Sequence, residues 1–156
     1  FLMVFIALPG LQRSQRDSQR KRDMFRLATA LKNYKANNKQ KNLWDGATKE
    51  DPSVDFTSVY VQDIESFVDN YLKAGNDTFK DPLYGEYRLR VYGLLPGVVI
   101  SADYSWYEKR PEWRAMVKVN GNSRCENQAG QYSYSSGGGF TIIHRLENGG
   151  WVCQEF

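Results

Sequence analysis

The sequence predicts an α+β fold in which a long, protruding N-terminal helix packs on a head built around an antiparallel β-sheet. Apolar side chains recur at helical spacing between residues 12 and 38, and short segments from residue 86 onward alternate like strands with one buried face. The length of 156 residues suits one compact head and is short for two. We therefore expect an N-terminal helix over residues 1–42 and a head over residues 43–156.

The expected helix opens on an apolar run from Phe1 to Leu8 and becomes charged soon after Pro9 and Gly10. The run is shorter than the roughly 20 residues that cross a bilayer. We interpret it as the visible end of a longer hydrophobic segment; a soluble domain with an exposed apolar start is the alternative. Proline lacks a backbone donor and glycine adds backbone entropy, so the sequence predicts a kink or a locally melted stretch at these two residues.

Beyond Gln12 the helix is expected to resume and to end near Asn38, with Met24, Leu27 and Leu31 on one apolar face. At 1.5 Å per residue, the whole segment is on the order of 57 Å long. A head of this size does not need so long a helix. We therefore expect part of it to protrude.

The head is expected to begin with a loop over residues 43–57 and a second helix over residues 58–74. Strands are predicted over residues 86–92, 97–102 and 115–119, and loops over residues 122–139. The chain closes with a predicted hairpin of residues 140–146 and 151–154. Its turn contains Asn148 and Gly149, a pair that supplies the positive φ of such turns.

The net charge of +3 is unevenly divided along the chain. Residues 1–42 hold ten Lys or Arg against two Asp, a net charge of +8, whereas the remainder holds eleven basic and sixteen acidic residues, a net charge of −5. A basic helix followed by an acidic body suggests a segment beside a membrane or a helix that meets acidic surfaces of neighbouring subunits. A solvated basic face is the alternative.

The sequence holds few groups that could perform catalysis. The lone histidine, His144, falls in a predicted strand, where we expect its hydrogen bonds to be satisfied; a general base or metal ligand is the alternative. No nucleophile elbow, phosphate-binding loop or Cys/His metal motif occurs, so we expect no enzyme, no cofactor and no metal. Five carboxylates around the second helix resemble Ca²⁺ ligands, but we interpret them as solvated charge. They are Asp63, Glu65, Asp69, Asp77 and Asp81.

The even cysteine count, Cys125 and Cys153, is compatible with one disulfide in an oxidising compartment. An antiparallel sheet can bring the segments that carry them within bonding distance. Two buried free thiols are the alternative.

The order of elements resembles a type IV pilin, with an apolar helical half, a proline, an amphipathic half, a connecting loop, a sheet and a C-terminal cysteine pair. Residues 1–17 and residues 145–153 are particularly similar to pilins of ultrasmall bacteria that live attached to other bacteria. In the family an N-methylated Phe is followed by a Glu at position five, whereas this chain has Phe5. If Pro9 matches the family's proline, the family's start lies upstream of Phe1.

The resemblance implies a structural subunit that waits in the cytoplasmic membrane, is assembled by the pilus machinery and polymerises with its own copies into an extracellular filament. Such filaments serve adhesion, twitching motility or host-cell contact. It implies a disulfide between Cys125 and Cys153. Arg13, Arg16, Arg20 and Arg22 are expected to pair with acidic groups of other subunits. The expected filament core comprises Phe1, Leu2, Met3, Val4, Phe5, Ile6, Leu8, Pro9 and Gly10.

Three alternatives remain open. A pseudopilin of a secretion system has the same helix and head but often carries a Ca²⁺ loop in place of the C-terminal disulfide. A membrane-tethered binding module would not polymerise. A DNA-uptake pilin would use exposed aromatic and basic side chains to stack on and attract nucleic acid. The candidates for that role are Trp106, Tyr107, Trp113, Tyr132 and Tyr134 with Lys109, Arg110, Arg114 and Arg124.

Overall fold

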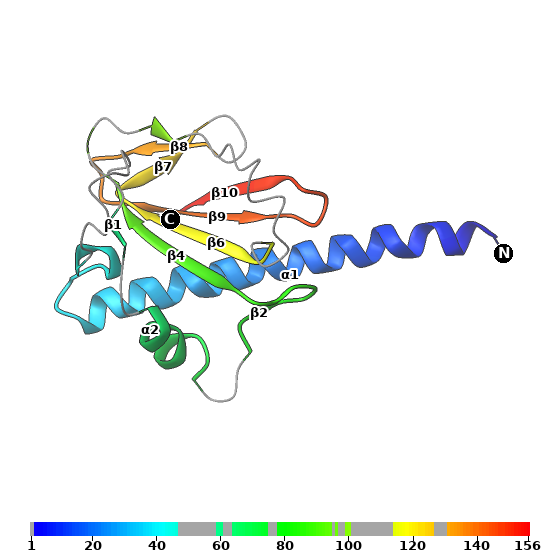
Figure 1. The fold of residues 1–156 in the computed structure, drawn as a ribbon, viewed down its shortest axis with the longest axis horizontal. Helices are drawn as coiled ribbons and strands as arrows, with labels where there is room; N and C mark the ends of the chain where they lie inside the picture. The colour runs from blue at the N-terminus through cyan, green and yellow to red at the C-terminus, as the bar shows by residue number, and fades with distance from the viewer. Residues whose placement is uncertain are drawn as a thin grey trace.

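The helix α1 (Leu2–Asn37) lies along one face of a five-stranded β-sheet and continues past the sheet at its N-terminal end (Figure 1). The computed structural model describes residues 2–46, 59–60, 64–74, 78–94, 96, 99–100, 114–126 and 131–156. Of residues 2–7, 46, 59–60 and 99–100 it describes the backbone alone. The described part is an α+β structure with the predicted long N-terminal helix.

The helix is continuous through Pro9 and Gly10, so the predicted locally melted stretch is wrong for this chain. Proline removes one hydrogen bond, which the carbonyl of Phe5 would otherwise accept, but its fixed φ of about −65° is itself helical. Gly10 is exposed and its neighbourhood is open. Neither residue therefore forces the backbone out of the helical conformation.

The other end of α1 lies one residue before the predicted end. Lys39 and Gln40 take left-handed backbone conformations, with φ of 54° and 64°. The amide of Gln40 donates to the carbonyl of Lys35 at 3.0 Å, which satisfies one of the last free carbonyls of the helix. The chain then turns into the 3₁₀ helix η1 (Leu43–Gly46) at the start of the predicted loop.

The five-stranded sheet has the order β1-β4-β6-β9-β10. Its strands β4 and β6 are parallel, with Arg88 beside Met116 and Gly93 beside Gly121, whereas the other neighbours are antiparallel. The prediction of an antiparallel sheet is therefore wrong at its centre. The strands are β1 (Val59–Tyr60), β4 (Arg88–Gly93), β6 (Met116–Gly121), β9 (Phe140–Arg145) and β10 (Trp151–Glu155).

The closing hairpin is confirmed. Strands β9 and β10 pair antiparallel, and Gly149 in their turn has a φ of 88°. The predicted second helix is shorter than expected: α2 is Ile64–Tyr71, and Val59–Tyr60 pairs with β4 instead of extending it. Its expected stop, Gly75, lies outside the described residues.

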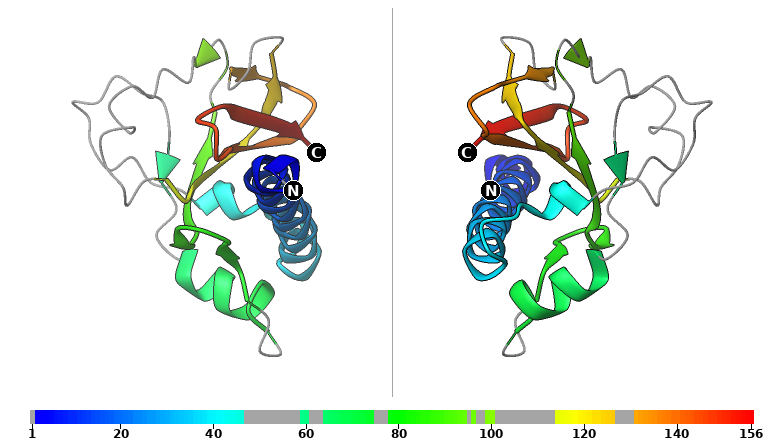
Figure 2. Two further views of the ribbon diagram at one scale, coloured as in Figure 1. Left: turned by 90° about the vertical axis from the view of Figure 1, so that its right-hand side faces the viewer. Right: turned by 90° about the vertical axis from the view of Figure 1, so that its left-hand side faces the viewer.

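Two smaller sheets complete the described head. A hairpin of β2 (Lys80–Asp81) and β3 (Gly85–Glu86) lies beside α1. The segment predicted as loops over 122–139 contains two strands, β7 (Ser123–Cys125) and β8 (Tyr132–Tyr134), which form a three-stranded sheet with β5 (Val99–Ile100). Figure 2 shows these strands on the far side of the main sheet from α1.

The main core fills the space between α1 and the five-stranded sheet. Met24, Leu27 and Leu31 of the helix are buried, as the apolar face predicted. They share one cluster with alternate residues of the sheet, so one face of each central strand is covered by the helix. Those sheet residues are Leu89, Val91, Val117, Val119, Phe140 and Ile142.

Trp44 of η1 occupies the end of this core beside two strand glycines. Its indole packs on Phe140, with ring centroids 5.4 Å apart. A Cβ added at Gly121 would lie 2.3 Å from Trp44 Nε1, whereas one at Gly93, its register partner, would meet Trp44 at 3.8 Å or more. Gly121 therefore leaves the space that the indole fills.

Cys125 and Cys153 form a disulfide, with Cα atoms 5.9 Å apart. The predicted bond is confirmed. It joins β7 to β10 and so ties the second sheet to the end strand of the main sheet. A loop of this length contributes roughly 3–4 kcal/mol of stability in the chain-entropy model.

Candidate functional site

The N-terminal part of α1 projects beyond the head (Figure 1). Leu8 and Leu11 are 43% and 58% exposed, and Pro9 and Gly10 are exposed between them. The projecting segment therefore presents apolar side chains away from the core, which is unfavourable for an isolated chain in water.

The expected filament-core residues are described to different extents. Leu8, Pro9 and Gly10 lie on the projecting segment. The backbones of residues 2–6 continue the same helix, while nothing is described of their side chains. Phe1 lies outside the described residues.

A partly buried ion cluster fixes α1 where it leaves the head, and we call it the neck cluster. Its members are Arg16, Asp17, Arg20, Asp81 and Glu147. They come from the helix, the β2–β3 hairpin and the β9–β10 turn. Three parts of the chain that are far apart in sequence therefore meet at one point.

Arg20 is the centre of the neck cluster and is only 2% exposed. Its Nε and Nη2 donate to Asp81 at 2.6 and 3.0 Å, and its Nη1 donates to Asp17 at 2.6 Å. Burial by itself lowers the pKa of Arg20, but the hydrogen bonds to the two carboxylates outweigh it and raise this pKa above its usual value. The Tyr84 ring lies 5.8 Å from the guanidinium. Arg20 therefore stays charged inside the protein.

The two carboxylates of the cluster also hold backbone groups in place. Oδ1 of Asp81 accepts the amides of Leu83 and Tyr84 at 2.8 and 2.9 Å, which shapes the β2–β3 turn. Oδ1 of Asp17 accepts the amide of Glu147 at 3.1 Å. Each charge pair thus also positions a turn against the helix.

Arg16 forms a bidentate ion pair with Glu147: its Nε and Nη2 donate to the two carboxylate oxygens, each at 2.6 Å. The hydrogen bond from Arg16 lowers the pKa of Glu147. Arg13, the next basic residue toward the N-terminus, lies 3.6 Å from the same carboxylate but is largely exposed. The pairing extends the neck cluster toward the projecting segment.

Arg16 and Arg20 are both bound within their own chain, while the expectation that the four arginines pair with acidic groups of other subunits stays a prediction. Arg13 contacts Glu147 at the surface, and Arg22 is exposed. Asp81 was expected to be solvated, yet it is buried against Arg20. The sequence gives the charge of a side chain, but it does not give the distant residue with which that side chain pairs in the folded protein.

His144 lies beside the neck cluster on the helix-facing side of β9, and it is 2% exposed. Neither ring nitrogen has a hydrogen-bond partner in the described part of the chain. The expectation that the hydrogen bonds of His144 are satisfied is therefore wrong. Burial, together with the positive charges of Arg20 and Lys21, lowers the pKa of His144 to about 4, although the carboxylates of Asp17 and Asp81 act in the opposite direction. His144 is therefore neutral at pH 7.

We expect the variant His144→Leu to flatten the pH dependence of stability. The wild-type unfolded state binds a proton at His144 near pH 6.5 and the folded state only near pH 4, so stability is full above pH 6.5 and falls toward pH 4. The loss attributable to this group is about 3 kcal/mol. Urea titrations of both proteins at pH 7 and pH 4 measure the difference. Parallel stability curves for the two proteins would contradict the assignment.

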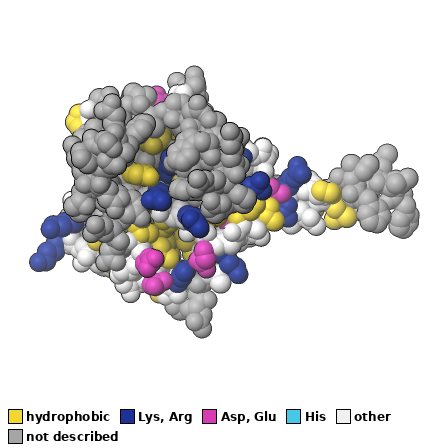
Figure 3. All heavy atoms as spheres, in the orientation of Figure 1, with side chains coloured by type: hydrophobic (Ala, Val, Ile, Leu, Met, Phe, Trp, Pro, Cys, Tyr) yellow, Lys and Arg dark blue, Asp and Glu magenta, His cyan; other side chains and the backbone are white. Residues whose placement is uncertain are grey.

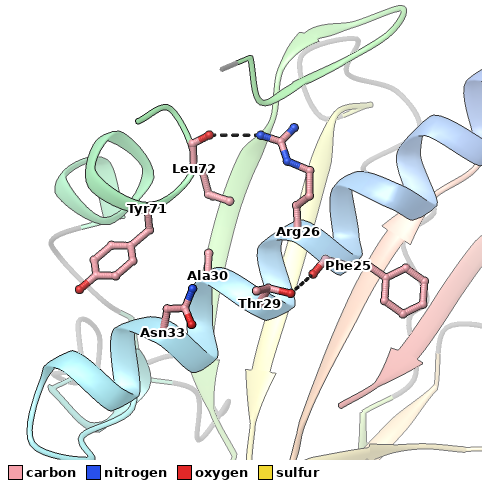
Figure 4. Close-up of a pocket in the computed structure, with 7 residues that line it drawn as sticks. All are labelled: Phe25, Arg26, Thr29, Ala30, Asn33, Tyr71 and Leu72. Carbon is pink, nitrogen blue, oxygen red and sulfur yellow. Dashed lines mark hydrogen bonds between the residues drawn. The ribbon is translucent and has the colours of Figure 1, made fainter. Parts of the chain in front are cut away.

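A surface pocket of about 350 Å³ lies between α1 and α2 (Figure 4). Arg26 crosses it and donates to the carbonyls of Leu72 and Thr78. The hydroxyl of Thr29 donates to the carbonyl of Phe25 in its own helix, and Asn33 and Tyr71 close the far end. The pocket is thus bridged by a structural contact that holds α2 to the helix.

The residues suggested for nucleic-acid binding are only partly described. Tyr132 is buried in a second apolar cluster with Leu94 and Ile143, and Tyr134 is partly buried against that cluster. Arg124 is paired with Glu126. Arg114 lies over the ring of Tyr84, 5.6 Å from its centroid. Trp106, Tyr107, Lys109, Arg110 and Trp113 lie outside the described residues, as do the carboxylates Asp63 and Asp77.

No helix in the described part of the chain combines the length and the apolar composition needed to cross a bilayer. Within the same part, no three His, Cys, Asp or Glu side chains are grouped as metal ligands would be. Comparisons of the chain with protein-family models, with curated proteins and with solved structures found no match.

Proposed function

We propose that this chain is a structural subunit of a type IV pilus that polymerises through the projecting end of α1 into a surface filament. The observation that carries the proposal is the exposure of Leu8 and Leu11 on a helix that the head does not cover at that end. Apolar surface of this kind gains about 25 cal/mol per Å² when it is buried between copies. Self-association therefore removes this apolar surface from water.

The neck cluster supports the same proposal. A helix that joins a head to a filament core has to leave the head at a fixed angle. Arg16 holds α1 to the β9–β10 turn, and Arg20 holds it to the β2–β3 hairpin. Helix, sheet and C-terminal disulfide also follow the order of elements in a type IV pilin. The bond between Cys125 and Cys153 favours a pilus subunit over a secretion pseudopilin.

In this proposal the subunit resides in the cytoplasmic membrane before assembly, is delivered by the pilus machinery, and acts outside the cell in adhesion, twitching motility or host-cell contact. Heads line the filament surface, and the helices fill its centre. The partners are further copies of the same chain.

We expect Leu8→Asp and Leu11→Asp to reduce filament assembly at least tenfold, because a carboxylate in a dry helical core is costly to bury. Surface filaments are counted by negative-stain electron microscopy of expressing cells, and self-association of the purified chain is measured by analytical ultracentrifugation. The unfolding of the head should not change, because Leu8 and Leu11 lie outside its core.

Asn148→Asp is the matched control, since it adds the same charge at an exposed turn and keeps the oxygen that accepts the Gly150 amide. It should assemble as the wild type does. A wild-type chain that stays monomeric in both measurements, or Asp variants that assemble normally, would refute the proposed function.

A further inference from the structure

The exposed side of α1 carries positive charge without negative charge. The two acidic residues of this helix, Asp17 and Asp23, are both turned toward the head. Asp17 binds Arg20, and Asp23 is buried, accepts a hydrogen bond from the Tyr87 hydroxyl and lies 3.5 Å from Arg26. The head thus takes up the acidic side chains of the helix.

What remains on the outside of α1 is a surface that we call the basic face. Lys21, Arg22 and Lys32 are exposed on it, and Phe25 is 57% exposed among them. Lys32 and Phe25 both lie against the ring of Phe156 at the end of the chain. Like charges so close together repel one another unless an acidic surface lies opposite them.

A complementary surface occurs on α2, and we call it the acidic face. Phe67 is buried and packs on Tyr34 of α1, with ring centroids 5.8 Å apart. Glu65 and Asp69 lie two positions to either side of Phe67, about 160° away around the helix, and both are exposed. Neither forms an ion pair within the described residues. Figure 3 shows acidic side chains, with Lys and Arg side chains between them, on the part of the head below the sheet.

The two faces cannot meet within one chain. Since α2 packs on α1 through Phe67, its acidic face points away from the helix that carries the basic face. The end-on views of Figure 2 show α2 below the sheet and α1 beside it, as separate parts of the molecule. If two such surfaces on the same molecule pair with each other, the pairing has to be between separate copies.

We propose that the basic face of α1 in one copy docks on the acidic face of α2 in a second copy. The inference rests on the proposed function and names the contact between heads. Such a head-to-tail contact uses two different patches, so a pair of copies retains one free basic face and one free acidic face, and the association continues as an open polymer or a ring. Burial of the exposed Phe25 ring adds apolar contact at the centre of the charged surface.

The charges affect the relative orientation of the two copies and the rate at which they associate more than the affinity of the contact. Exposed ion pairs each contribute roughly 0.2–1 kcal/mol, and salt screens them over about 8–10 Å. Association should therefore weaken as salt rises, while the apolar contact of the projecting segments is not weakened in this way. The docking sets which face of a subunit meets its neighbour.

The test is a charge-reversal swap in the full chain. Lys21→Glu/Arg22→Glu and, separately, Glu65→Lys/Asp69→Lys are each expected to weaken self-association at least tenfold in analytical ultracentrifugation at low salt. The four changes combined restore the pairing with the signs exchanged and should recover most of the wild-type association. Lys39→Glu/Lys41→Glu changes the net charge as much as the first variant, at exposed sites beyond the end of α1, and should have little effect.

The outcomes separate this inference from the proposed function. Wild-type filaments that neither reversal weakens, or reversals that the combined swap does not rescue, overturn the inference and leave the pilus proposal standing. A wild-type chain that stays monomeric overturns both.

Binding to phosphatidylglycerol vesicles is measured in parallel. If Lys21→Glu/Arg22→Glu abolishes that binding and leaves self-association unchanged, the basic face serves a lipid surface and the inference is overturned.

Discussion

Arg20→Met is expected to lower the free energy of unfolding by about 3–5 kcal/mol, the range for removing one partner of a buried ion pair. The side chains of Arg20 and Asp81 are both 2% exposed, so the variant leaves the carboxylate of Asp81 buried without its cation. Asp17 loses its partner too. Urea titration followed by circular dichroism gives the difference directly.

Two variants isolate the cause. Arg13→Met removes an arginine from the same helix that is largely exposed and 3.6 Å from Glu147, so it should cost less than about 1 kcal/mol. Adding Asp81→Asn to Arg20→Met removes the stranded charge and keeps an oxygen for the Leu83 and Tyr84 amides, so stability should partly recover. If Arg20→Met costs no more than Arg13→Met, the neck cluster does not anchor the helix.

Gly121→Ala is the second change with a large expected effect. Its new Cβ would lie 2.3–2.4 Å from three atoms of the Trp44 ring, a distance that ring and strand cannot share. The indole has to leave its place against Phe140, so we expect a loss of about 3–5 kcal/mol, as for truncation of a buried aromatic side chain.

Gly93→Ala provides the matched control for this variant. Gly93 pairs with Gly121 across the parallel strands, and a Cβ there meets Trp44 only at 3.8–3.9 Å, which is ordinary contact. It should change stability by less than about 1 kcal/mol. In a double-mutant cycle, Gly121→Ala should add little to Trp44→Ala if it acts through the indole. Additive losses would place the strain elsewhere.

Patterns within short stretches of sequence correctly predicted the helix and the closing hairpin. The helix from residue 12 to its C-terminal end follows from the spacing of Met24, Leu27 and Leu31, and the last hairpin from its Asn-Gly turn. The parallel pairing of β4 with β6 could not be predicted in this way, because alternation shows which face of a strand is buried and not which way its neighbour runs. Val59–Tyr60 likewise became a strand by pairing with a distant one.

The candidate site shows the same limit. The sequence predicted an apolar start and a basic helix, and Leu8, Leu11 and Arg22 lie exposed as that pattern suggests. It could not show that Arg20 meets Asp81, 61 positions away, or that Arg16 meets Glu147, 131 positions away. His144 was expected to find hydrogen-bond partners, but its place in the strand turns it toward the helix beside Arg20.

The route from the helix into the sheet also determines how the head resists mechanical tension. Arg16 and Arg20 connect α1 to the turn between β9 and β10, and these strands run along the same direction as the helix in Figure 1. A pull on the projecting end therefore acts along the strands, and since their hydrogen bonds lie across the strands it loads them in shear, all together. The bond from Cys153 to Cys125 passes part of that load to β7 through a covalent link. Pulled along its helix, the head is loaded in its stiff direction.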